Sequence, residues 1–171
     1  MPSYREIVTK AVVGRGKKVF SSNHEISLDI NPTTILGCWV INHSFSGEKI
    51  NNEVFISGSF DVNLWYSNQE NTSTEVVKDS VKYKEKINVK MSDDKYDGND
   101  EIIVRTLKQP VCVKAEIVDG MIKYVIEKEF AVEVVGDVMI NVGINDDVVS
   151  WDESDDNLEK EINDSVNEKF L

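Results

Sequence analysis

Carboxylates and asparagines gather around Gly98 in residues 93–101 (DDKYDGNDE), which makes this segment the best candidate for a metal site in the sequence. Oxygen ligands of this kind are the ones that Ca²⁺ prefers. However, aligning Gly98 with the central glycine of an EF-hand loop puts Lys95 and Val104 at ligand positions, where neither can serve. A polar loop between strands explains the composition more simply, with weak, adventitious Ca²⁺ binding as the alternative. We therefore expect no resident metal and no cofactor.

His24 and His43 are the only histidines, and Cys38 is close enough in sequence to His43 to suggest a nucleophile and its base. In a regular strand, five residues of separation put two side chains on opposite faces, which argues against such a dyad. The local motifs of serine hydrolases and zinc enzymes are also missing from the sequence. We therefore expect that the protein is not an enzyme.

Cys38 and Cys112 are the only cysteines, and each lies in an apolar, strand-like stretch. Free thiols in such stretches usually behave as small buried hydrophobic groups, which favours reduced core residues. A disulfide, or a crosslink between subunits formed in oxidising surroundings, is the alternative that the sequence leaves open.

Negative charge dominates the chain and is concentrated at its end. The formal net charge is -12, and residues 145–171 carry ten acidic and two basic side chains. An acidic chain repels phosphate backbones, so we expect no binding to nucleic acid. Because no apolar run is long enough to cross a bilayer and the first 20 residues do not resemble a signal peptide, we also expect no membrane insertion and synthesis in the cytoplasm.

Hydrophobic residues alternate with polar ones over most of the chain, which is the pattern of half-buried strands. A clear example is the series Phe60, Val62, Leu64 and Tyr66. Turn-forming pairs separate such runs, and they are Asn51-Asn52, Asp119-Gly120 and Gly136-Asp137. Gly58, inside a run, suggests a bulge or a close backbone approach. We predict an all-β fold, an antiparallel β-sandwich over residues 21–144.

Residues 1–20 are predicted to form a separate N-terminal element. Ser3 and Glu6 match a capping box, and a short amphipathic helix follows until Gly14, before a basic turn at residues 14–18 (GRGKK). Its apolar stripe consists of Tyr4, Ile7, Val8, Ala11 and Val12. The stripe either packs on the chain's own sheet or docks on another subunit or protein.

Residues 145–171 are predicted to form an acidic, largely disordered tail, because low hydrophobicity and high charge cannot offset the entropy of ordering. Four apolar residues recur at every fourth position, so a helix could form on contact with a partner; they are Leu158, Ile162, Val166 and Phe170. The tail is either a solubilising extension or an arm that folds against other proteins.

Trp65 lies between Leu64 and Tyr66 in a strand whose alternation points Trp65 outward. An exposed tryptophan on a sheet face suggests a protein interface. The alternatives are that this face is covered within the domain, or that it binds carbohydrate.

Two strand-like segments also have distinctive amino-acid sequences. They are residues 35–45 (ILGCWVINHSF) and 54–67 (VFISGSFDVNLWYS). Together with residues 4–13, 74–83 and 127–136, they resemble the CotE family of morphogenetic proteins from the outer spore coat of endospore-forming bacilli. The resemblance implies a structural scaffold made in the mother-cell cytoplasm. It implies that the protein multimerises around the forespore on the inner basement layer, recruits other spore-coat proteins and ends in the outer coat.

The resemblance also associates the N-terminal part with self-assembly and the C-terminal region with recruitment of partners. The tail of this chain departs in detail from the longer, glutamate-rich ending of the family, so individual contacts do not carry over. The alternative function is a monomeric β-sandwich module that binds spore or cell-wall glycan. A scaffold should form large species as its concentration rises, whereas such a module should stay monomeric.

Overall fold

The computed structural model describes residues 3–92 and 96–144, and every helix or strand assigned within these ranges is a strand. The strands are β1 (Ser3–Ser27), β2 (Pro32–Ile50), β3 (Glu53–Asn68), β4 (Ser73–Ile87), β5 (Lys90–Met91), β6 (Tyr96–Val118) and β7 (Met121–Ile144). The prediction of an all-β fold is therefore confirmed.

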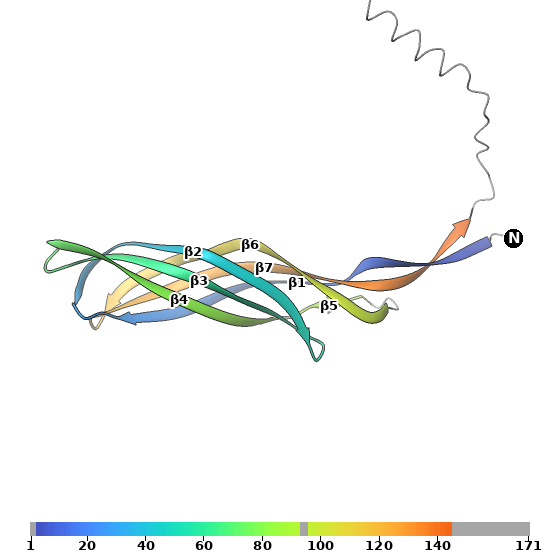
Figure 1. The fold of residues 1–171 in the computed structure, drawn as a ribbon, viewed down its shortest axis with the longest axis horizontal. Helices are drawn as coiled ribbons and strands as arrows, with labels where there is room; N and C mark the ends of the chain where they lie inside the picture. Colours follow the sequence, from blue (N-terminus) through green and yellow to red (C-terminus); the bar gives the residue numbers. More distant parts are fainter. Residues whose placement is uncertain (1–2, 93–95, 145–171) are drawn as a thin grey trace, which may run out of the picture. The chain divides into compact units, whose positions relative to one another are not determined.

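Two sheets contain all the described strands (Figure 1). The four-stranded sheet has the order β5-β1-β7-β6, and the three-stranded sheet has the order β2-β3-β4. The pairings of β1 with β5, β2 with β3, β3 with β4 and β6 with β7 are all antiparallel. The described residues divide into two compact units, one made of residues 3–7 with residues 141–144 and one lying within Val8–Ile140. The hydrophobic core lies in the second unit.

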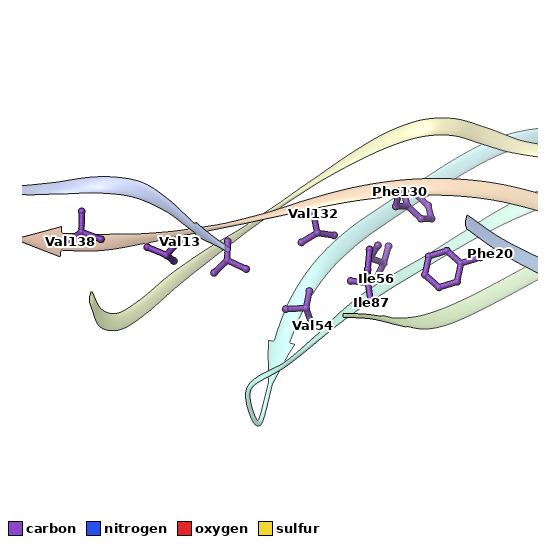
Figure 2. Packing of buried hydrophobic residues seen from close by; sticks show 9 residues of the cluster. Val13, Phe20, Val54, Ile56, Ile87, Phe130, Val132 and Val138 are labelled. Carbon is purple, nitrogen blue, oxygen red and sulfur yellow. The ribbon is translucent and has the colours of Figure 1, made fainter. Parts of the chain in front are cut away.

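The core consists of two hydrophobic clusters, and each contains side chains from both sheets. Figure 2 shows the first cluster, in which Phe20 of β1 and Phe130 of β7 lie close to Ile56 of β3. The second cluster joins Phe60, Val62, Leu64 and Tyr66 of β3 to Ile122, Tyr124 and Ile126 of β7. Every second residue of β3 and β7 is buried over most of these strands, because each is flanked on both sides within its sheet and covered on one face. This packing confirms the predicted antiparallel sandwich.

The predicted N-terminal helix is wrong, because Ser3–Ser27 is one long strand. The local spacing of apolar residues fits a helix, but β-branched residues such as Ile7, Val8 and Val12 favour strands. A short isolated helix gains little stability in water, whereas β1 pairs beside β7 in a sheet. The functional separation of residues 1–20, 21–144 and 145–171 stays a prediction.

Two of the predicted turns are confirmed and one is wrong. Asn51 and Asn52 have φ of 49° and 66° between β2 and β3, and Asp119 and Gly120 have φ of 53° and 76° between β6 and β7. Asparagine, aspartate and glycine tolerate this left-handed region well. At Gly136, by contrast, β7 continues because that residue pairs with Asp100 of β6.

A register shift in β2 between Ile41 and Ser44 changes which face of the strand points inward. Before the shift, Cys38 packs against the second core cluster. After it, the rings of His43 and Phe45 lie 6.0 and 5.3 Å from that of Phe130 in the first cluster. The expectation that Cys38 and His43 lie on opposite faces is therefore wrong, because a bulge adds a residue to one strand and reverses the alternation beyond it.

Candidate functional site

Two tryptophans form an exposed pair on the outer face of the three-stranded sheet. The indole centroids of Trp39 in β2 and Trp65 in β3 lie 5.7 Å apart, with an angle of 87° between the rings. An edge-to-face pair of this geometry is a favourable aromatic contact. Nevertheless, Trp39 is 51% and Trp65 45% exposed, so a large part of both rings faces solvent. The outward orientation predicted for Trp65 is confirmed.

Gly37 allows the two rings to meet. It pairs with Trp65 across the strands, and a Cβ atom on Gly37 would lie 2.5 Å from Cη2 of Trp39. The Trp39 indole therefore lies back along its own strand over the bare backbone of Gly37, toward Trp65. A side chain at this position would displace the ring.

Exposed aliphatic side chains extend the same face. Val76 of β4 pairs with Trp65, and Ile41 of β2 follows Trp39 at the next outward position. Val76 and Ile41 are 45% and 41% exposed. We call Trp39, Ile41, Trp65 and Val76 the Trp patch. The pairing of three strands assembles it, which is why the sequence indicated Trp65 but not Ile41 or Val76.

A polar network borders the Trp patch. Asp61 of β3 accepts hydrogen bonds from Ser80 Oγ of β4 at 2.6 Å and from Asn42 Nδ2 of β2 at 2.8 Å. These two bonds, with a weaker contribution from the charge of Lys78, lower the pKa of the Asp61 carboxyl. The side of the Trp patch toward Asp61 therefore carries a fixed negative charge at neutral pH.

Lysines continue the outer face along β4, at Lys78, Lys82, Lys84 and Lys86. Lys84 Nζ lies 2.7 Å from Glu48 Oε1 and lowers the pKa of that carboxyl, and Lys86 pairs with Glu53. All these groups are well exposed, so the pairs contribute little to folding. β4 is an edge strand, and a row of lysines is a common protection of such an edge against pairing with another chain.

The other predicted contact residues do not join the Trp patch. Tyr4, Ile7, Val8, Ala11 and Val12 lie along β1 instead of forming a helical stripe. Leu158, Ile162, Val166 and Phe170 lie outside the described residues. Asp93 and Lys95 of the candidate metal loop lie outside them too, and within the described ranges the histidines, cysteines and carboxylates form no cluster suited to a metal.

Both histidines are held in place by contacts with neighbouring side chains. The His43 ring lies 2.7 Å from the hydroxyl of Tyr83 through Nε2 and 3.0 Å from Oε1 of Gln109 through Nδ1. The His24 ring stacks on Tyr124 with centroids 5.1 Å apart, and its Nε2 lies 2.8 Å from Ser22 Oγ. Burial lowers the pKa of both imidazoles, so both rings are favoured in the neutral form that such packing requires.

Comparison with known proteins gives the family. A family model described as outer spore coat protein E (CotE) matches residues 3–171. The chain belongs to the CotE family. A search of curated proteins finds no match. The resemblance drawn from five short segments is thus confirmed over nearly the whole chain.

CotE is a structural family of the spore coat and not a family of enzymes, which agrees with the use of both histidines in packing. Membership makes this chain an outer spore coat protein and places it in the spore coat. No helix suited to spanning a membrane occurs in residues 3–92 and 96–144. In this CotE family chain, the Trp patch is an exposed aromatic surface on the three-stranded sheet.

Proposed function

We propose that this CotE family protein is a morphogenetic scaffold that multimerises around the forespore, and that the Trp patch is a contact between copies. The observation that carries the proposal is the exposure of Trp39 and Trp65 side by side on one sheet face. Leaving two large aromatic rings in water forgoes hydrophobic free energy of about 25 cal/mol for each Å² left uncovered. Tryptophan is also strongly enriched among the residues that dominate the energy of protein interfaces.

The sheet edge is a less suitable contact. Pairing β4 with β4 of a second copy would bring two rows of lysines together, including Lys82, which has no acidic partner within 4.0 Å among the described residues. Like charges in close register oppose association. Stacking two copies through the Trp patch reduces this repulsion, because Lys84 and Lys86 lie at the other end of the strand pairing and only Lys78 is next to the patch on β4.

Recruitment of other coat proteins is the second part of the proposal. The acidic residues 145–171, with Leu158, Ile162, Val166 and Phe170, would serve as an arm that folds against basement-layer and outer-coat partners. The exposed residues of β1 offer a further contact, since Tyr4 is 66% and Val8 65% exposed. Many weak contacts of this kind gain strength once subunits are held close together. The protein would be made in the mother-cell cytoplasm and would then settle in the outer coat.

Sedimentation velocity of the purified full chain over a wide range of concentrations tests the proposal. A self-assembling scaffold moves to larger species as concentration rises. Adding salt should weaken the assemblies if contacts between the β4 lysines and acidic tails help to set their register, and should leave them unchanged if only apolar contacts hold them. A single monomeric boundary at every concentration would contradict self-assembly.

One observation favours a second candidate, a monomeric module that binds spore or cell-wall glycan. The aromatic rings of the Trp patch stand beside the polar network of Asn42, Asp61 and Ser80, so an apolar surface and hydrogen-bonding groups face the same side. Retention of a monomer on purified spore peptidoglycan, and its loss when Trp39 is replaced, would support this function. Passage through the material without delay would exclude it.

A further inference from the structure

Two cysteines from different sheets belong to β2 and β6, strands that contact each other. Cys38 belongs to β2 of the three-stranded sheet and Cys112 to β6 of the four-stranded sheet. Both pack against the same hydrophobic cluster, around Leu64 and Ile126. Both are only partly exposed, and both are free thiols in this structure.

Three contacts between β2 and β6 fix how these strands run past each other. The Nδ1 atom of His43 lies 3.0 Å from Oε1 of Gln109. Gly47 lies against Val104, whose Cγ2 would be 2.5 Å from a Cβ atom on the glycine, and Lys49 pairs with Asp100. In these contacts the residue numbers on β6 decrease as those on β2 increase, so the two strands run antiparallel to each other. From His43 back to Cys38 on β2, the neighbouring position on β6 therefore moves forward from Gln109 toward Cys112.

The two thiols are near enough for Cys112 to affect the ionisation of Cys38. Cys112 Sγ donates a hydrogen bond to the carbonyl oxygen of Lys114 at 3.3 Å. Burial, and then the neighbouring Cys112 thiol, raise the pKa of the Cys38 thiol. The antiparallel course of β2 and β6 and the shared hydrophobic cluster thus bring the two cysteines close to each other in the reduced state.

We propose that Cys38 and Cys112 are a paired oxidation site that forms an intramolecular disulfide between the two sheets. A crosslink between subunits is then not their main product. Glutathione disulfide, or another small disulfide, is the class of oxidant. This site functions whether or not the protein assembles through the Trp patch.

The reaction balances in two exchange steps. One protein thiol loses its proton, and the thiolate attacks a sulfur of glutathione disulfide to form a mixed disulfide and release one glutathione. The second thiol then loses its proton and attacks the protein sulfur of the mixed disulfide, which expels the second glutathione. The two electrons of the protein thiols end on the two released glutathiones. Because the thiolate is the attacking species and the pKa of Cys38 is raised, oxidation should become faster as pH rises.

The new bond would tie β2 to β6 across a long segment of chain. Crosslinks that close long loops restrict the unfolded chain most, so the oxidised protein should melt roughly 10 °C above the reduced one. Inside a reducing cell the pair would stay reduced, and it would form only where small disulfides accumulate.

Oxidation of the folded, full-length protein with excess glutathione disulfide tests the proposal by intact mass and by peptide mapping without reductant. We expect loss of the mass of two hydrogen atoms, no retained glutathione, one linked peptide pair containing Cys38 and Cys112, and reversal by dithiothreitol. Covalent dimers, stable glutathione adducts, or thiols that stay unreacted while the denatured chain oxidises would each overturn it.

Single substitutions provide the matched controls. In Cys38→Ala the remaining Cys112 has no partner to expel glutathione, so the adduct should persist, and Cys112→Ala should show the same for Cys38. If either variant folds poorly, the comparison of oxidised and reduced wild-type protein still decides the question through its melting temperature. An unchanged melting temperature in a fully crosslinked sample would overturn the claim that the bond lies across the fold.

Discussion

The hydroxyl of Tyr83 in β4 lies 2.7 Å from Nε2 of His43 in β2, although β3 runs between these two strands. Gly58 of β3, which pairs with Tyr83, makes the contact possible because it has no side chain in the way. A Cβ atom at Gly58 would lie 2.4 Å from the Tyr83 hydroxyl oxygen and 2.5 Å from the carbonyl oxygen of Ser44. The close approach expected for Gly58 from the sequence is confirmed.

Replacing Gly58 with alanine should destabilise the protein by about 3 kcal/mol, because the backbone of Ser44 cannot move away as a flexible side chain could. Urea unfolding followed by tryptophan fluorescence measures this loss. Gly143→Ala is the matched control, because a Cβ atom there meets only Cε1 of Tyr4, at an ordinary 3.8 Å. Equal stability of the two variants would contradict the close packing of Tyr83 and Ser44 against Gly58.

Acid should destabilise the fold through His43. Burial and the charge of Lys128 lower the pKa of this imidazole, while its bond to Gln109 acts in the opposite direction. Because the folded pKa lies below the unfolded value of 6.5, the stability from the neutral ring is present above that value and falls as pH drops toward the folded pKa. Protonation also removes the lone pair of Nε2 that accepts the Tyr83 hydroxyl.

Urea midpoints at pH about 7.5 and about 5.5 should therefore differ in wild-type protein, and the difference should be smaller in His43→Gln. Part of the difference should remain, because burial lowers the pKa of His24 as well. Exposed carboxylates with lowered pKa, such as Asp61, titrate below this window and do not interfere. A pH dependence that is unchanged in His43→Gln would refute the assignment.

Lys128 is a fully buried lysine that lies 4.3 Å above the ring centroid of Tyr83 and 3.3 Å from Oε1 of Glu85. Breaking only the ion pair leaves the charge of Lys128 buried, so Glu85→Gln should lower the free energy of unfolding by about 2 kcal/mol. The loss is smaller than for a fully buried pair because Glu85 is partly exposed. Lys128→Met removes the buried charge and keeps the length of the side chain, so its cost should stay below about 1 kcal/mol. Thermal unfolding of both variants shows which one loses more stability. A larger loss of stability in Lys128→Met than in Glu85→Gln would contradict this interpretation.

The sequence was sufficient to predict a strand wherever that strand buries one face against the other sheet. Phe60, Val62, Leu64 and Tyr66 alternate with polar residues because β3 is central in its sheet, and the pattern therefore reports burial directly. The turn at Asp119-Gly120 was predictable for a local reason, since these residues adopt positive φ easily.

Features that depend on a distant partner were not predictable in this way. Residues 3–13 have apolar spacing that fits a helix, and the presence of β7 beside them adds to their β-branched residues in favouring a strand. The bulge near Asn42, which turns His43 inward, has no local signal beyond an asparagine able to adopt a φ of 54°. In the candidate site, the outward direction of Trp65 followed from alternation, but its contact with Trp39 depends on strand register and on the bare backbone of Gly37.

Gly37→Ala should separate the tryptophan pair without unfolding the protein, because the atoms in the way belong to the Trp39 side chain, which can turn aside, and not to the backbone. We expect a change in near-ultraviolet circular dichroism and in tryptophan emission, with a loss of unfolding free energy below about 1 kcal/mol. A spectrum identical to that of the wild type would show that the two rings do not depend on Gly37 for their contact.

The most direct test of the central proposal is light scattering after size exclusion on the full chain and on the double variant Trp39→Ser, Trp65→Ser, over the same concentration series. The control is Leu107→Ser, which changes a side chain of β6 that is as exposed as Trp39, at 51%. We expect large species that grow with concentration for the wild type and for the control, and a monomer for the double variant. Assembly that survives in the double variant, or a wild type that stays monomeric throughout, would contradict the Trp patch as the contact between copies.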